Sequence, residues 1–178
     1  MSTVSSYCTG FAPSIDENCT HIILGSMPSV ASLGANQYYA HPQNRFWPLL
    51  AHILENTAAP VSYTERLQML LRHHIALWDS IAVCEREGSL DSAIKNDQGN
   101  DFAALLEKYP HLHTICFNGG KSFQCFKKYN KQLLGRTDIQ FYQLPSTSPA
   151  NARWTMAMLE DAWKKAFSPE NNPAIPAP

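Results

Sequence analysis

Residues 24–50 read LGSMPSVASLGANQYYAHPQNRFWPLL, and this stretch decides the fold that we expect for the chain. It begins at the end of an apolar segment, His21–Gly25, whose composition predicts a buried strand. It ends in apolar residues at helical spacing, which predict a helix that begins near Asn44. Because open α/β sheets place their ligand sites between the end of a strand and the next helix, we expect the loop between these two elements to be functional.

Outside this stretch, apolar strand-like segments alternate with segments of helical periodicity. Such alternation is typical of a parallel sheet that is covered by helices on both faces. We therefore predict an α/β fold, a three-layer αβα arrangement with a central, mostly parallel sheet of about four strands. The expected strands are 21–25, 113–118 and 139–144, together with a strand in 75–83 that runs into a turn, and the expected helices are 44–54, 64–73, 101–109, 122–133 and 152–167.

The loops that follow the strands should meet, because right-handed crossovers place the carboxyl ends of parallel strands at one edge of the sheet. The three loops concerned are 25–44, 118–121 and 145–151. We expect a single domain over residues 1–167 and a proline-rich, flexible tail over residues 168–178. Residues 1–18 are expected to form an irregular lead-in, and residues 85–100 a charged connection.

The composition narrows the class of protein. A chain of 178 residues, 44% of them hydrophobic, is long enough for one core. Its five cysteines form no CxxC pair, which argues against zinc ribbons and iron–sulfur clusters and predicts buried free thiols. Because no apolar run could cross a bilayer and no signal peptide opens the chain, we expect a cytoplasmic protein without membrane contact. The net charge of −1 favours a small, local footprint on any nucleic acid.

Gly120-Lys121-Ser122 follows a predicted strand and opens a predicted helix, as the end of a nucleotide-binding P-loop does. That pattern needs a glycine five positions before Gly120, and the residue there is Ile115. We therefore expect no nucleoside triphosphate site, although the glycines leave room for a weak anion site at the helix N-terminus.

The most specific segment is His41–Trp47, HPQNRFW, which two tyrosines precede. A helix cap with a buried aromatic pair would not need so many polar and stacking groups. The run Gly25–Trp47 resembles the first motif of the uracil-DNA glycosylase superfamily, and its HPQNRFW is similar to the H-P-x-N-R-F-W of the mismatch-specific uracil/thymine-DNA glycosylases. Residues 145–149, PSTSP, stand where that superfamily has its second motif, a loop that presses on the strand carrying the flipped-out base. The resemblance implies the uracil-DNA glycosylase-like fold.

The turn after the first strand departs from the mismatch-specific enzymes. Their catalytic asparagine lies in that turn, where this chain has Met27, and a methionine cannot orient a water molecule. The segments GSMPS, HPQNRFW, ALWDS and FNGGK resemble instead the hypoxanthine-DNA (deoxyinosine) glycosylases, which lack the turn residue and use the asparagine of H-P-x-N. The resemblance therefore implies that Asn44 is the catalytic residue and that its amide oxygen orients the water.

The resemblance also implies roles for other loop residues. Tyr39 would stack on the base, although Tyr38 could do so instead and either could be an ordinary core or surface residue. Asn118 would read the base edge, because hypoxanthine presents an acceptor beside a donor; the alternative is a turn residue before two glycines. The expected base contacts are Tyr39, Asn118, Ser26 and Met27, and the expected DNA contacts are Ser29, Lys121, Ser146, Thr147, Ser148 and Asn151. Asn151 and Arg153 could fill the gap that the flipped-out base leaves in the duplex. His41 is expected to support the loop. Asp79 and Asp91 match family segments, but the sequence indicates no physical role for them.

From these residues we expect a DNA-deoxyinosine glycosylase of base-excision repair, acting as a monomer on DNA that contains a deaminated base. Hydrolysis by water needs neither a metal nor a cofactor, so neither is expected. Uracil or xanthine is the alternative base, because uracil presents a similar O4/N3–H edge. An alternative of another class is a non-catalytic nucleic-acid or nucleotide binding module of the same fold, which Met27 favours and the pair Asn44 and Asn118 opposes.

Overall fold

Four parallel strands form the central sheet of the computed structural model, which describes residues 6–168. In sheet order they are β3 (Ile75–Asp79), β2 (His21–Gly25), β6 (Thr114–Asn118) and β7 (Gln140–Leu144). β2 pairs in parallel with β3 and with β6, and β6 pairs in parallel with β7. The four expected strands and their parallel arrangement are therefore confirmed.

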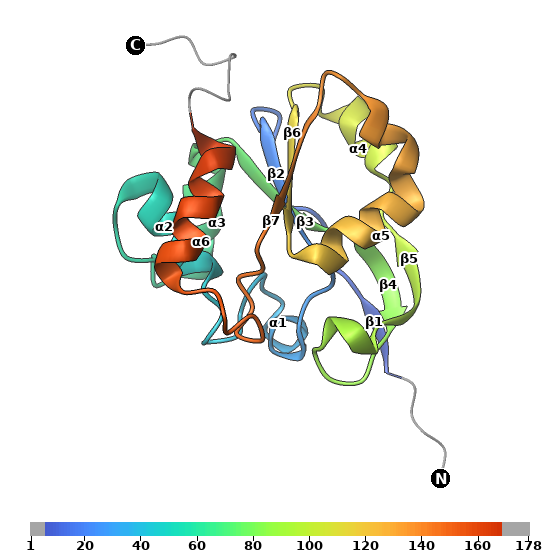
Figure 1. Ribbon diagram of the computed structural model, residues 1–178, viewed down its shortest axis with the longest axis horizontal. Coiled ribbons are helices and arrows are strands. Elements are labelled where there is room, and N and C mark those ends of the chain that lie inside the picture. The colour runs from blue at the N-terminus through green and yellow to red at the C-terminus, as the bar shows by residue number, and fades with distance from the viewer. Residues whose placement is uncertain (1–5, 169–178) are drawn as a thin grey trace.

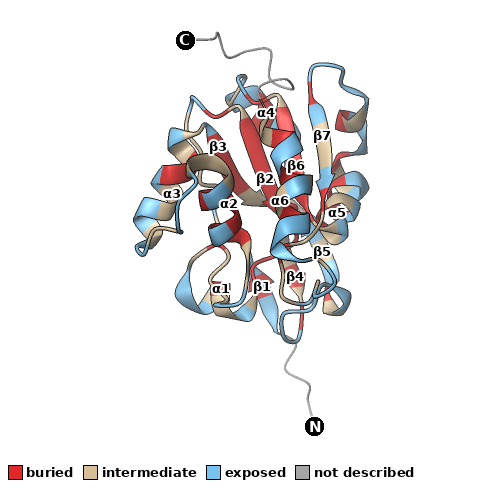
Figure 2. Ribbon diagram, turned by 60° about the vertical axis from the view of Figure 1, so that its left-hand side comes forward, coloured by how far each residue is buried: buried red, intermediate tan, exposed pale blue. Residues whose placement is uncertain are grey.

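Helices cover both faces of this sheet (Figure 1). Along β2, Ile23 packs into the core on one face, and Ile22 and Leu24 pack into the core on the other, as the period of a strand requires. Because both faces are covered, β2 and β6 are buried along their whole length (Figure 2), which explains their continuous apolar sequences. The first face carries α2 (Phe46–Glu55), α3 (Tyr63–Arg72) and α6 (Met156–Lys164), and the second carries α4 (Phe102–Lys108) and α5 (Gly120–Asn130). The three-layer αβα arrangement is confirmed.

Side-chain caps fix where several helices begin. Ser62 accepts a hydrogen bond from the backbone N–H of Glu65 at the start of α3, and Asp101 caps α4 in the same way. Thr155 caps α6, so this helix begins at Met156 and not at residue 152, where it was expected. Two short 3₁₀ helices, η2 (Lys131–Gly135) and η3 (Lys165–Phe167), extend α5 and α6.

A second, antiparallel sheet was not predicted. It contains β1 (Tyr7–Thr9), β4 (Ile81–Glu85) and β5 (Lys95–Gly99) in the order β1-β4-β5, beside the short 3₁₀ helix η1 (Asp91–Ala93). The apolar segment 75–83 was expected to be a strand that runs into a turn. The chain does turn after Asp79, but the residues beyond the turn form a strand of the second sheet, which was not expected. The expected lead-in and charged connection supply β1 and β5. β5 reads KNDQG and is mostly exposed, so it lacks the apolar pattern by which strands are recognised.

The first loop is also more ordered than expected, because it contains the helix α1 (Val30–Ala35), with Ser29 as its N-cap. Within residues 6–168, no helix is long and apolar enough to cross a membrane. The expected tail falls almost wholly on residues 169–178, which lie outside the described residues. The division at residue 167 stays a prediction.

Candidate active site

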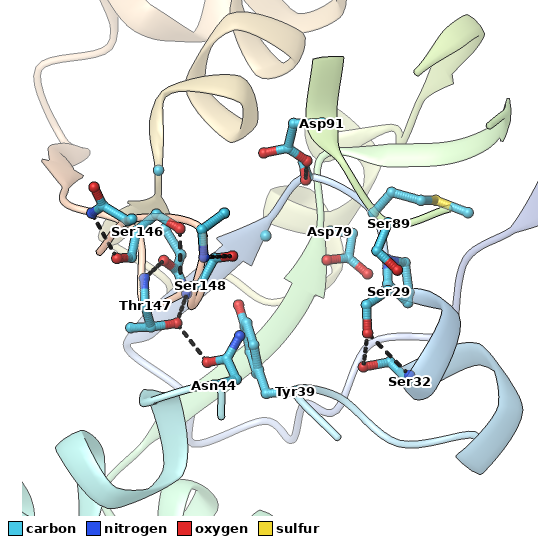
Figure 3. A pocket seen from close by; sticks show the side chains of 18 of the residues that line it. Ser29, Ser32, Tyr39, Asn44, Asp79, Ser89, Asp91, Ser146, Thr147 and Ser148 are labelled. Carbon is cyan, nitrogen blue, oxygen red and sulfur yellow. Dashed lines mark hydrogen bonds between the residues drawn. The ribbon is translucent and has the colours of Figure 1, made fainter. Parts of the chain in front are cut away.

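A pocket of about 510 Å³ lies at the carboxyl ends of the four parallel strands (Figure 3). The three loops that were expected to converge all line it, and the connection between β4 and β5 adds a fourth segment. The residues in its lining are Gly25–Ser29, Ser32, Tyr38, Tyr39, Asn44, Asp79, Ser89–Ser92, Asn118–Gly120, Leu144–Ser148, Ala150 and Asn151. This volume is in the range of small-ligand sites, so the pocket can receive a group of the size of a nucleobase.

Two glycines allow the loops to approach one another. A Cβ atom at Gly25 would lie 2.6 Å from Oδ1 of Asp79, which is closer than real Cβ atoms approach an oxygen. Gly119 has a φ angle of +93°, and a Cβ atom at this position would lie 3.1 Å from the Cβ of Ser146, so the missing side chain leaves room for Ser146. The missing side chain at Gly25 thus allows the ends of β2 and β3 to lie close together, and that at Gly119 does the same for the loops after β6 and β7.

A chain of hydrogen bonds runs along one side of the pocket through Asn118, Thr147 and Asn44, which we call the amide wall (Figure 3). Nδ2 of Asn118 donates to Oγ1 of Thr147 at 3.0 Å, and Oδ1 of Asn118 accepts from the backbone N–H of Thr147 at 3.0 Å. Oγ1 of Thr147 donates in turn to Oδ1 of Asn44 at 2.9 Å. Because a hydroxyl has a single hydrogen, the direction of this chain is fixed from Asn118 to Asn44.

The helix that follows Asn44 fixes the orientation of its amide. The backbone N–H of Phe46, one of the free donors at the start of α2, donates to Oδ1 of Asn44 at 2.9 Å. Two donors therefore occupy the amide oxygen, which the sequence had assigned to the water. The amide nitrogen makes no hydrogen bond within residues 6–168, and it points into the pocket (Figure 3). The group that Asn44 offers to a ligand is a donor.

Arg45 holds the loop after β7 in place, a role that the sequence did not indicate. Its backbone N–H donates to the carbonyl of Thr147 at 3.1 Å. Its guanidinium donates to the carbonyls of Ser148 and Asn151, each at 3.1 Å, and to that of Trp154. One side chain thus satisfies three carbonyls of a loop that has no regular structure, and the order of the segments along the chain could not indicate this pairing.

The opposite side of the pocket carries Asp79 and Asp91 (Figure 3), and together with Ser26, which is bonded to Asp91, we call them the carboxyl wall. Oγ of Ser26 donates to Oδ1 of Asp91 at 2.5 Å, which ties η1 to the turn after β2. Asp79 is only 4% exposed, and its Oδ2 has no hydrogen-bond partner among the described residues. Burial raises the pKa of Asp79 to about 7, with Arg86 lowering it and Asp91 raising it further.

Tyr39 lies at the floor of the pocket, with its ring stacked on Phe46 at 3.8 Å between centroids and an interplanar angle of 17°. Its φ angle is +54°, a conformation that turns the backbone sharply before the helix. The hydroxyl of Tyr39 is buried and makes no hydrogen bond among the described residues. Burial and the Asp79 carboxyl group raise its pKa, and the nearby Asn118 amide opposes that rise. Tyr38, the alternative stacking residue, instead donates its hydroxyl hydrogen to the carbonyl of Ala12 at 2.8 Å.

The other expected site residues divide into two groups. Ser26, Met27, Ser29, Ser146, Ser148 and Asn151 line the pocket. Met27 also packs into the small core under the second sheet, and Ser29 accepts a hydrogen bond from the backbone of Ser32 at 3.1 Å. Lys121 and His41 lie outside the lining, and Nδ1 of His41 accepts from the backbone N–H of Gln43 at 3.1 Å, which braces the turn.

Comparison with known proteins places this geometry among DNA glycosylases. The family model of the uracil DNA glycosylase superfamily matches residues 12–167. The hypoxanthine DNA glycosylase of Methanosarcina acetivorans is 38% identical over 158 residues, covering 89% of this chain and 96% of the relative. That of Methanosarcina barkeri is 37% identical, with the same coverage of each chain. A solution NMR structure from Methanosarcina acetivorans, described as a candidate uracil DNA glycosylase, has a TM-score of 0.77 and 37% sequence identity, covering 91% of this chain and 97% of that one.

Proposed function

This chain belongs to the uracil-DNA glycosylase superfamily, and from that premise we propose that it removes hypoxanthine from DNA by hydrolysing the N-glycosidic bond of deoxyinosine. The observation that carries the proposal is its 38% identity to a hypoxanthine DNA glycosylase over 89% of the chain. The pocket supports it independently, because the loops with the family motifs enclose a space of about 510 Å³ that can hold a base.

The reaction needs the target nucleotide to leave the duplex and enter this pocket. The electrons of the N-glycosidic bond then leave with the base, and the hydroxyl of a water molecule joins C1′ of the sugar. The second proton of that water passes to the departing base. Negative charge develops on the base during this step, so fixed donors around the base accelerate it.

We assign to Asn44 the role of positioning the attacking water molecule. Its oxygen is occupied by Phe46 and Thr147, so its nitrogen can donate a hydrogen bond to the water oxygen and turn the remaining lone pair toward C1′. The Asn44 amide needs little reorganisation during the reaction, because the backbone of α2 and the amide wall already fix its orientation. Asn44 thus remains the proposed catalytic residue, with the opposite end of its amide in use.

DNA is the proposed partner, and the rim of the pocket provides its contacts. Asn118 keeps one free hydrogen and one free lone pair for the base edge, since Thr147 uses the others. The proposed contacts to the base are Tyr39, Asn118, Ser26 and Met27, and those to the backbone are Ser29, Ser146, Ser148 and Asn151 from the lining and Lys121 from outside it. Thr147, which was also expected to contact DNA, is fully buried, and its hydroxyl, N–H and carbonyl are bonded to Asn118, Asn44 and Arg45, so it acts within the amide wall instead. The monomeric state and the cytoplasmic location stay predictions.

The test is an excision assay on matched oligonucleotides that contain deoxyinosine, deoxyuridine, deoxyxanthosine or deoxyadenosine at one position. Alkali after incubation breaks the strand wherever a base has been removed. We expect breaks at deoxyinosine and none at deoxyadenosine, and far slower breakage at deoxyinosine with the Asn44→Ala variant. Breaks only at deoxyuridine or deoxyxanthosine would replace hypoxanthine by that base. Tight binding to the deoxyinosine strand without breaks at any base would favour a non-catalytic binding module.

A further inference from the structure

Asp79 is a buried carboxyl group in the pocket, and the proposed reaction assigns no role to it. It is the last residue of β3, and its side chain lines the cavity. Among the described residues, no Lys, Arg or His nitrogen lies within 4.0 Å of its carboxylate oxygens. The charge of Arg86 acts on Asp79, but Nη2 of Arg86 donates to the carbonyl of Pro28, and its buried Nε and Nη1 make no hydrogen bond among the described residues. A buried carboxyl group that lacks both an ion pair and a hydrogen bond at one oxygen needs another explanation.

A second unpartnered group lies beside it. A Cβ atom at Gly25 would be 2.6 Å from Oδ1 of Asp79 and 3.3 Å from the hydroxyl oxygen of Tyr39, so both polar groups converge above this glycine. The hydroxyl of Tyr39 is also buried without a partner among the described residues. Two unsatisfied polar groups at the floor of one cavity are what a pocket presents before a polar ligand enters.

The surroundings of Asp79 favour the neutral form of its carboxyl group. Burial is the largest cause of the raised pKa, which is about 7, and the charge of Asp91 adds to it while that of Arg86 opposes it. A neutral carboxyl group has an O–H that can donate, whereas a carboxylate can only accept. The titratable and charged groups that act on Asp79 or respond to it are Tyr38, Tyr39, Tyr63, Arg86 and Asp91.

We propose that Asp79 contacts the flipped-out base as a neutral carboxyl group and donates a hydrogen bond to the carbonyl oxygen that deamination has introduced. The proposal rests on the proposed function, because it needs a base in this pocket. Deamination of adenine replaces an amino group by the O6 oxygen of hypoxanthine, and an O–H donor is complementary to that oxygen. Charge that develops on the departing base spreads to the same oxygen, so the bond strengthens as the glycosidic bond breaks. Uracil and xanthine carry the same kind of oxygen, so the contact selects deaminated bases as a class.

The test measures single-turnover excision of hypoxanthine from a deoxyinosine oligonucleotide between pH 5.5 and 9, for the wild type, Asp79→Asn and Asp79→Ala. An asparagine keeps a donor and the size of the side chain but does not titrate. The wild-type rate should fall above pH 7, by up to about tenfold per pH unit, as Asp79 ionises. Asp79→Asn should stay within about tenfold of the wild type at pH 6 and lose this fall, and Asp79→Ala should be about 100-fold slower at pH 6.

The matched control is Asp97→Asn in β5, another carboxyl group with a buried unpartnered oxygen, which lies outside the pocket lining. It should keep the wild-type profile. A fall above pH 7 that persists in Asp79→Asn would overturn the role of Asp79 while leaving the proposed function intact. Release of no base by the wild type would overturn both. Thermal unfolding of each variant shows whether it is folded, and Asp79→Asn alone decides the matter if Asp79→Ala is not.

Discussion

The two sides of the pocket carry similar polar side chains, yet they differ in how completely those side chains are bonded. In the amide wall, Asn118, Thr147 and Asn44 bond to one another and to the backbone, so each orientation is determined before a ligand arrives. Across the pocket, Asp79 and the nearby Tyr39 each retain a buried polar atom without a partner. The first arrangement is typical of groups that position a reactant, and the second of groups that a ligand completes.

This difference explains how a chain with Met27 in the first turn can still hold a reactive centre. The turn after β2 supplies space and a link to Asp91 through Ser26. The fixed donor is supplied by the next segment, where the start of α2 and the loop after β7 meet at Asn44. The site therefore depends on one threonine that joins two asparagines from distant parts of the chain.

Breaking the amide wall at Thr147 should slow the reaction strongly. Thr147→Val removes the hydroxyl while keeping the shape of the side chain, so Asn118 loses an acceptor and Asn44 loses a donor. We expect single-turnover excision to slow by about 10- to 100-fold, since an unsatisfied buried polar group costs about 1–3 kcal/mol. The control is Thr147→Ser, which keeps the hydroxyl. If both variants excised hypoxanthine at the wild-type rate, the hydrogen-bonded chain would have no part in the reaction.

Displacing the Asp79 carboxyl group of the carboxyl wall should have a smaller effect, which we expect to see in the stability of the protein. In Gly25→Ala the new Cβ would lie 2.6 Å from Oδ1 of Asp79, so the carboxyl group has to move. We expect the free energy of unfolding to fall by about 1–3 kcal/mol, as for other overpacked positions. Gly34→Ala in α1 is the matched control, because no heavy atom lies within 4 Å of its Cβ position and alanine suits a helix. Urea unfolding of both variants measures the difference, and equal stabilities would show that Asp79 is not held against Gly25.

The smallest expected effect is a pH dependence of stability that arises from Asp79. Its pKa in the folded protein is raised to about 7, so between pH 4 and 7 it ionises in the unfolded chain but not in the folded one. Its contribution to stability is full below pH 4 and declines as the pH rises to 7. Asp79→Asn lacks this decline. The unfolding free energy of the variant minus that of the wild type should therefore be about 1 kcal/mol larger at pH 8 than at pH 6. A constant gap between the two proteins would mean that Asp79 titrates normally.

Much of the fold follows from patterns that are local in the sequence. The inner strands β2 and β6 are mostly apolar because both of their faces are buried, and their parallel direction follows from the helices between the strands. The second sheet was missed because β5 is polar and exposed, and its place depends on pairing with β4. Pairing between distant segments leaves no local periodicity.

The site could be predicted only in part for the same reason. The sequence indicated which loops meet, and the pocket contains the expected residues Tyr39, Asn44 and Asn118. It could not indicate that Arg45 holds the loop after β7, nor which end of the Asn44 amide faces the ligand. Both facts depend on hydrogen bonds between the start of α2 and the loop after β7, which are more than a hundred residues apart in the chain.

The orientation of Asn44 is the central claim, and Asn44→Asp tests it most directly. An aspartate can still accept from Phe46 and Thr147, but it presents an oxygen to the pocket where the asparagine presents a donor. The measurement is single-turnover excision of hypoxanthine by the wild type, Asn44→Ala and Asn44→Asp at pH 7. We expect both variants to be about 100- to 1,000-fold slower than the wild type, because each lacks the donor. Excision by Asn44→Asp at or above the wild-type rate would contradict the account, since it would show that the group facing the water is an acceptor.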